Sequence, residues 1–273
     1  MLVTPPFGAS SNIALWRAYS KPPVELVVAD LDSILVTELI GEEDYIMANR
    51  PVYCSTDESP YYKAIDIEFE FFSGFSIQQK QRSIRSLHES FIKNYSEKKV
   101  LEVSRKSANL IGNRLSAFNL KYKYEGKFYP VECLFQGSKV FESGVVYQEL
   151  YDGEPRAAKK DERLKSSGKI VGFKLFDKDF PSEPKDFFYN WLYINALVES
   201  KEVGKELLNY DSFTDIEFNP KKSINCQAIA TAIYVGLYRN GLLEKALESS
   251  ENFRTIVYGE KQEKLVQMSL FDL

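Results

Sequence analysis

The first 72 residues alternate short apolar runs with turn-rich polar pieces. Residues 24–31 (VELVVADL) and 64–72 (AIDIEFEFF) have the length and the β-branched and aromatic content of strands. Residues 48–51 (ANRP) and 56–60 (TDESP) combine Pro with Asn, Asp or Ser, which favours loops. We therefore expect a β-rich N-terminal region over residues 1–72.

The pattern changes after Ser76, where the apolar period becomes helical. Residues 76–99 predict an amphipathic helix, with apolar positions at Ile77, Ile84, Leu87 and Phe91. Residues 100–104 (VLEVS) follow as a short strand. Residues 115–131 alternate around Gly126, which can take the positive φ of a tight turn, so they predict a β-hairpin. A helix over residues 131–141 (VECLFQGSKVF) is expected directly after it.

The second half of the chain is mainly helical in pattern. Residues 156–168 predict a charged helix that ends at Gly168, and residues 172–181 predict a strand. Two long helical patterns, 187–210 and 226–249, flank a polar loop. The fold class is therefore α+β. We expect a mainly helical core with short hairpins over residues 73–258, after the β-rich region 1–72 and before a flexible tail, 259–273.

Composition narrows the class of protein. The net charge of -4 and the pI of about 5.4 argue against a protein that coats nucleic acid non-specifically, although a local basic patch is compatible with them. The three cysteines have no close spacing, so we expect neither disulfides nor a metal knuckle. No run approaches the ~18 apolar residues of a membrane span, and no export signal is apparent. We expect a cytoplasmic protein without a metal or cofactor.

The chemistry is restricted further by the histidine count. His88 is the only histidine, and it lies in the amphipathic helical pattern. No GxSxG turn, Walker A motif, GxGxxG or HExxH sequence is present. An active site in this chain must therefore use carboxylates, lysines and amides.

The helix predicted over residues 131–141 offers such a group of side chains. Glu132, Gln136 and Lys139 fall at i, i+4 and i+7, within a narrow arc of one face. One interpretation is a solvated stripe on an amphipathic helix. The other is a carboxylate held rigidly at the mouth of a cleft by the preceding hairpin. Spacing alone permits both.

Several motifs in order resemble the NADAR (YbiA-like) family: LSAFN, EGKFYPVE, FQGSKVF, RAAKKDERL and LLNYDSFTDIEFNPKKSINCQA. The segments GFSIQQKQRSIRSLHESF and NYDSFTDIEFNPKKSINCQA resemble more closely the NADAR antitoxins associated with DarT toxins (DarG-type). DarT enzymes attach ADP-ribose to DNA bases. The likeness to the NADAR family covers roughly residues 114–241, within the NADAR-like catalytic domain expected over residues 73–258. It implies hydrolysis of the N-glycosidic bond between ADP-ribose and guanine in DNA.

The resemblance also implies catalytic roles. Glu132 matches the family glutamate and would act as general acid and base, since the leaving base needs a proton. A lysine amine would attack the anomeric carbon and form a Schiff base. On the sequence, Lys123 in the hairpin is the first choice and Lys139 the second. For each lysine, an ordinary surface position is the alternative.

ADP-ribose would also need groups that bind its phosphates, riboses and adenine. The substrate-binding candidates are Phe118, Asn119, Lys127, Gln136, Arg156, Lys159, Trp191, Glu217 and Asn225. Arg156 and Lys159 could meet phosphates, and Phe118 and Trp191 could stack on a base. A charged helix face and a core position are the alternative interpretations for Lys159 and Trp191.

Two other functions stay open at this point. A NADAR hydrolase could act on a small N-riboside or ADP-ribose derivative, and a non-catalytic module could neutralise a DarT toxin by direct binding. The tail carries a separate hypothesis, because QMSLF resembles the pentapeptide by which bacterial proteins bind the DNA sliding clamp. Its anchoring residues would be Gln267, Leu270 and Phe271.

Overall fold

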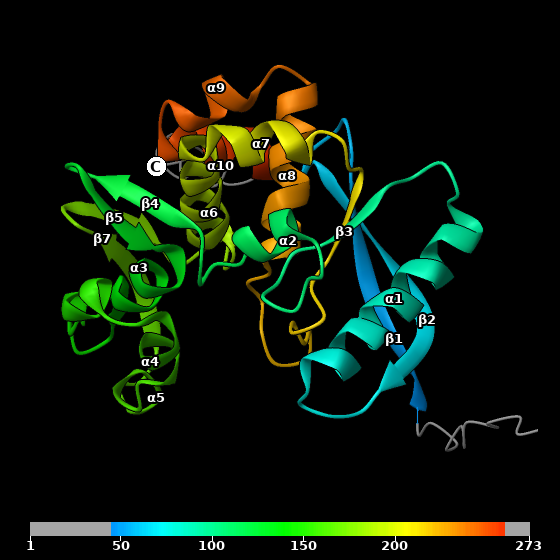
Figure 1. The fold of residues 1–273 in the computed structure, drawn as a ribbon. Coiled ribbons are helices and arrows are strands. Elements are labelled where there is room, and N and C mark those ends of the chain that lie inside the picture. The colour runs from blue at the N-terminus through cyan, green and yellow to red at the C-terminus, as the bar shows by residue number, and fades with distance from the viewer. Residues whose placement is uncertain (1–44, 260–273) are drawn as a thin grey trace, which may run out of the picture. The chain divides into compact units, whose positions relative to one another are not determined.

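The computed structural model describes residues 45–259 of the chain, and its fold is α+β, as the sequence predicts (Figure 1). A four-stranded sheet has the order β2-β1-β9-β3. Its strands are β1 (Tyr45–Ser55), β2 (Tyr62–Phe72), β3 (Val100–Glu102) and β9 (Ser212–Thr214). The helix α1 (Ile77–Asn94) lies against β2 and buries Ile84, Leu87 and Phe91 there. The amphipathic pattern after Ser76 thus predicted the helix and three of its buried positions, whereas Ile77, the fourth predicted apolar position, is 45% exposed.

The loop predicted over residues 48–51 is wrong, because these residues lie inside β1. Pro51 faces Asp66 of β2, and β1 pairs with β9 only at Tyr53 and Cys54. Pro51 therefore lies where β1 has one neighbouring strand, and a missing N–H is tolerated at such a position. The turn predicted over residues 56–60 does separate β1 from β2.

β1 and β2 share their sheet with strands from later in the chain. The pairing of Cys54 with Ser212 joins the part of the predicted N-terminal region that the structure describes to the predicted catalytic domain. The proposed division at Phe72 stays a prediction for the rest of that region.

A helical core forms the centre of the described residues. α6 (Phe187–Glu199) and α8 (Gln227–Arg239) pack against each other and are buried around most of their circumference, as expected for helices without a polar face. The smaller helices around them are α2 (Leu110–Arg114), α7 (Lys201–Leu207), α9 (Leu243–Leu247) and α10 (Ser250–Tyr258).

The predicted hairpin is present as β4 (Lys121–Tyr124) and β5 (Lys127–Pro130), with Gly126 at φ 79° in its turn. The helix after it, α3 (Val131–Gly137), is shorter than predicted. Lys139 lies instead on β6 (Lys139–Phe141), which pairs with β7 (Ile170–Leu175). Tyr151 packs so closely on Gly137 that a Cβ there would lie 2.7 Å from its ring.

Two further predicted elements are each divided in two. The charged helix is α4 (Pro155–Lys160) and α5 (Arg163–Ser166), separated at Asp161, whose backbone is extended. The strand predicted over residues 172–181 is a second hairpin, in which β7 turns at Phe176, at φ 51°, into β8 (Lys178–Pro181). A 3₁₀ turn, η1 (Gln148–Asp152), precedes α4.

Candidate active site

A cleft of about 1260 Å³ is lined by α3, β6, α4 and the chain between β9 and α8. In Figure 1 these are the green helices α3 and α4 and the yellow to orange segment that leads into α8. Two backbone hydrogen bonds fix the start of α3: Val131 N–H donates to Leu120 O at 3.0 Å, and Glu132 N–H donates to Ala117 O at 2.9 Å. The hairpin and the preceding loop therefore hold Glu132 in place.

Glu132, Gln136 and Lys139 form a chain of contacts in this cleft. Glu132 is only 4% exposed. Gln136 Nε2 donates to Glu132 Oε1 at 2.8 Å, and Lys139 Nζ donates to Gln136 Oε1 at 2.5 Å. On the other side, Lys159 Nζ lies 3.8 Å from Glu132 Oε2. The carboxylate thus contacts an amide and one cation, and a second cation is one amide away.

Lys139 has the environment of a reactive amine. Burial lowers the pKa of its ammonium group from 10.5 to about 8, with Glu132 opposing and Lys159 reinforcing the shift. Its Nζ also lies 5.0 Å from the centre of the Phe135 ring. A lysine with a pKa near 8 has a substantial neutral fraction at physiological pH, as a nucleophile requires.

Phe118 presents an aromatic surface in the same cleft, flanked by two cations. The Arg105 guanidinium lies 4.0 Å and Lys159 Nζ 5.1 Å from the centre of its ring. Arg105 Nε is buried and has no hydrogen-bond partner in the described part of the chain. The group combines a ring for stacking with positive charge, which are the features that bind adenine and a pyrophosphate. Phe118 and Lys159 were predicted from the sequence, whereas Arg105 was not.

Asp215 is a second carboxyl group that lines the cleft, and it too was missed from the sequence. Its Oδ1 accepts hydrogen bonds from the backbone N–H groups of Glu217 at 3.0 Å and Phe218 at 3.2 Å. Burial raises its pKa to about 7. Behind it, burial and the Asp215 charge raise the pKa of Glu102, which is 2% exposed, to about 8.

The parallel pairing of β3 with β9 brings Arg105 and Asp215 to the cleft. Glu102 and Thr214 are paired at the C-terminal ends of these two strands. The segments that follow the strands therefore leave the sheet at the same end. Glu102 accepts hydrogen bonds from Thr214 Oγ1 at 2.6 Å and from Ile216 N–H at 2.9 Å. These two bonds hold the C-terminal end of β3 to the segment that follows β9.

The cleft gathers seven of the residues predicted to form the site. These are Phe118, Glu132, Gln136, Lys139, Lys159, Glu217 and Asn225. Asn225 Oδ1 is buried and finds no hydrogen-bond partner among residues 45–259, so it is available to a ligand. These seven are a minority of the residues that line the cleft, and their roles in binding or catalysis stay predictions.

The remaining predicted residues lie elsewhere. Lys123 is exposed on β4, and Lys127 pairs with Asp152 at 2.5 Å. Trp191 packs in the core, 4.8 Å from the Phe180 ring, which corresponds to its alternative interpretation. Arg156 is exposed on α4 and does not line the cleft. Gln267, Leu270 and Phe271 lie outside the described residues.

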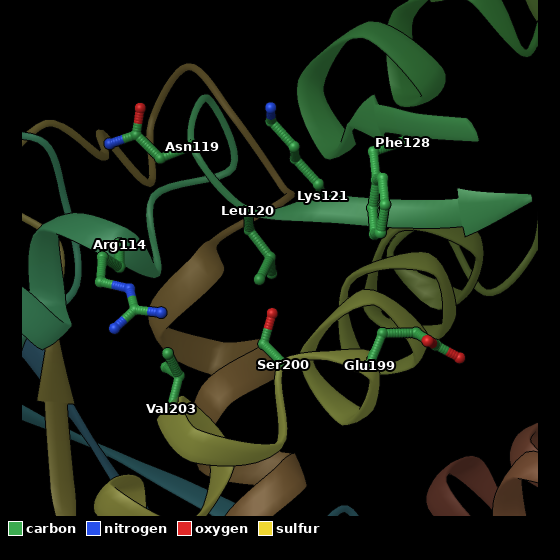
Figure 2. A pocket seen from close by; sticks show the side chains of 8 residues that line it. All are labelled: Arg114, Asn119, Leu120, Lys121, Phe128, Glu199, Ser200 and Val203. Atoms are coloured by element: carbon green, nitrogen blue, oxygen red, sulfur yellow. The ribbon is translucent and has the colours of Figure 1, made fainter. Parts of the chain in front are cut away.

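Asn119 lies in a different and smaller pocket of about 250 Å³, which also has Arg114, Lys121 and Glu199 in its lining (Figure 2). Its Nδ2 donates to Asn113 O at 2.9 Å. The turn between Ser116 and Leu120 sends Phe118 toward the cleft and Asn119 toward this pocket.

His88 and the cysteines contribute no reactive group to the cleft. Burial lowers the pKa of His88 to about 4, and its Nε2 lies 2.8 Å from Thr214 Oγ1. Cys54, Cys133 and Cys226 are buried free thiols. Within residues 45–259, no group of three His, Cys, Asp or Glu side chains is arranged to hold a metal ion.

Residues 48–267 match the family described as DarT1-associated NADAR antitoxin. The chain belongs to this NADAR family. The match includes β1 from Ala48 onward, together with every segment that lines the cleft. No curated protein matches the chain. None of the helices between residues 45 and 259 has the length and hydrophobicity to cross a membrane.

Proposed function

We propose that this NADAR protein is an N-glycosidase that removes ADP-ribose from guanine in DNA and so reverses the modification made by a DarT toxin. The observation that carries the proposal is the Glu132–Gln136–Lys139 arrangement, in which a buried carboxyl group and a lysine of lowered pKa share one cleft. The match to a family of DarT1-associated antitoxins supports a role in counteracting such a toxin. Flanked by Arg105 and Lys159, Phe118 is suited to the nucleotide part of the substrate.

The Glu132 and Lys139 pair can supply both an acid and a nucleophile. Moving one proton from the ammonium group to the carboxylate gives a neutral amine and a carboxylic acid without changing the total number of protons. The Lys139 amine then attacks the anomeric carbon, while Glu132 protonates the departing guanine nitrogen. The C–N bond to guanine breaks, and the base leaves unmodified.

The enzyme-bound intermediate is resolved by water. Opening of the ribose ring, with protonation of its ring oxygen, converts the lysine adduct into an iminium ion. Water adds to the iminium carbon as Glu132 removes one proton from the water. Glu132 then gives this proton to the lysine nitrogen, the carbon–nitrogen bond breaks, and the hydroxyl group loses its proton to Glu132 as it becomes the aldehyde of ADP-ribose. ADP-ribose and the free Lys139 amine are restored. In this scheme Gln136, which contacts both reactive side chains, is a positioning residue.

The first choice of nucleophile from sequence was Lys123, and the geometry favours Lys139. Lys123 is exposed on the hairpin and does not line the cleft, whereas Lys139 is one amide away from Glu132.

Incubation with an oligonucleotide carrying ADP-ribosylated guanine tests the proposal directly. The wild-type protein should release ADP-ribose and restore guanine, measured by mass spectrometry of both products. Glu132→Gln should release neither at a comparable rate. If the wild type releases nothing, the enzymatic proposal fails. Protection of cells by the inactive variant would instead support the toxin-binding alternative.

A further inference from the structure

The cleft carries more positive charge than one ADP-ribose needs. Its lining has seven cationic side chains against four carboxyl groups, although the whole chain has a net charge of -4. Three of these cations, Arg105, Lys139 and Lys159, contact Phe118, Gln136 or Glu132. A pyrophosphate has two negative charges, which Arg105 and Lys159 are sufficient to balance.

The other four cations are exposed lysines: Lys169, Lys185, Lys221 and Lys222. We call them the rim lysines. None of them is within 4.0 Å of a carboxylate in the part of the chain that the structure describes. Elsewhere on the surface Lys127, Lys165 and Arg239 do have such partners. The rim lysines therefore leave unneutralised charge at the edge of the cleft.

The rim lysines come from two separate parts of the fold. Lys169 and Lys185 flank the β7–β8 hairpin on its two sides, and Lys221 and Lys222 are in the chain between β9 and α8. A local turn presents this second pair, because Asn219 Oδ1 accepts from Lys221 N–H at 3.0 Å and Asn219 O accepts from Lys222 N–H at 2.9 Å. Both parts line the same cleft.

The size of the cleft also exceeds that of a small-ligand site. Its volume of about 1260 Å³ is larger than the roughly 300–1000 Å³ of most such sites. A DNA strand adds one negative charge per nucleotide, at a spacing that a row of lysines can follow. Since Glu132 is 4% exposed, a modified base must leave the duplex stack before its glycosidic bond can reach the carboxyl group.

We propose that the rim lysines bind the phosphates of a single DNA strand on both sides of the modified nucleotide. This rests on the proposed function, and it makes the substrate a nucleotide within a strand rather than a free ADP-ribosylated nucleoside. ADP-ribose occupies the region of Phe118, Arg105 and Lys159, and the strand follows the rim.

Charge reversal tests the rim. The variant K221E/K222E is compared with K201E/K205E, which makes the same change of charge on α7, away from the cleft lining. Binding of an unmodified fluorescent single-stranded oligonucleotide is measured by anisotropy between low and moderate salt. We expect K221E/K222E to weaken binding at least about tenfold and to reduce the slope of log K against log salt by roughly 1 to 1.5. K169E/K185E should act in the same direction.

Kinetics separate this proposal from the proposed function. The loss of kcat/KM in K221E/K222E should be at least about tenfold larger on a modified oligonucleotide than on modified guanosine monophosphate, mainly through KM. Equal losses of kcat/KM on both substrates, or equal weakening of DNA binding by K201E/K205E, would overturn the role proposed for the rim lysines. If the wild type hydrolysed neither substrate, the proposed function would fall instead. The anisotropy measurement would still decide whether the rim lysines bind DNA.

Discussion

The β4–β5 hairpin and the α3–β6 segment follow each other in the chain and both carry lysines, but they place these lysines in opposite environments. Lys123 and Lys127 stay exposed on the hairpin, and Lys127 is paired with Asp152. Lys139 is largely buried beside Glu132 and Gln136, and burial lowers its pKa to about 8. Residue type and proximity in sequence do not decide reactivity; desolvation and the nearest polar groups do.

The largest expected difference in activity between the two segments comes from removing one lysine amine from each. Lys139→Ala should lower kcat by at least about 1000-fold, because no nucleophile would remain at the anomeric carbon. Lys123→Ala removes the same amine from the hairpin and should retain activity within about twofold. Release of ADP-ribose in single-turnover experiments measures both. Comparable losses in the two variants would remove the distinction between the segments.

The carboxyl group allows the same contrast with a somewhat smaller effect. Glu132→Gln should lower kcat by roughly 100- to 10000-fold, the range for loss of a general acid. Glu125→Gln, in the turn of the hairpin, is the matched control and should be neutral. A Glu132→Gln variant with normal kcat would show that the leaving base obtains its proton elsewhere.

The pH dependence should change sign between wild type and Glu132→Gln. In the wild type, Glu132 and Lys139 must together hold one proton that can be given to the leaving base. Above pH about 8 Lys139 loses its proton, so kcat/KM should fall about tenfold per pH unit there. In Glu132→Gln only a neutral amine is needed, so the residual rate should rise with pH and then level off. It should level off below pH 8, because Glu132 raises the pKa of Lys139 in the wild type. Parallel profiles would contradict the assignment.

The smallest effect concerns stability, at the β3–β9 edge that supports the cleft. The pKa values of Glu102 (about 8) and Asp215 (about 7) are raised in the folded state, which therefore binds more protons than the unfolded chain. The stability that this difference provides should be fully present below about pH 4, near the unfolded pKa values, and should be lost progressively until the pH reaches the folded values of 7 to 8. His88 acts with the opposite sign, but only between its folded pKa of about 4 and its ordinary value of 6.5. Between pH 6.5 and 8.5 the Tm should therefore fall by a few °C.

Glu102→Gln provides the control for that stability effect. The amide stays neutral at every pH, so the Tm of this variant should depend less on pH than that of the wild type. Thermal melts in matched buffers measure it. An equal dependence in both proteins would show that Glu102 is ionised throughout this range.

Local patterns in the sequence were enough to predict α1 and the β4–β5 hairpin. The single helix face predicted for Glu132, Gln136 and Lys139 is wrong for Lys139, because α3 ends at Gly137 and the lysine is on β6. The three side chains lie together nonetheless. Arg105 and Asp215 could not be found in this way. They are more than 100 positions apart and line the same cleft because β3 and β9 pair in parallel, a pairing that leaves no local periodicity in the sequence.

Trapping the covalent intermediate tests the central claim most directly. Borohydride reduces a Schiff base to a stable secondary amine, so adding it during turnover of modified DNA should attach ADP-ribose to the enzyme. Peptide mass spectrometry then locates the adduct. The account predicts a single adduct on Lys139, absent from Lys139→Ala and present in Lys123→Ala. An adduct on Lys123, or full turnover with no lysine adduct, would contradict it.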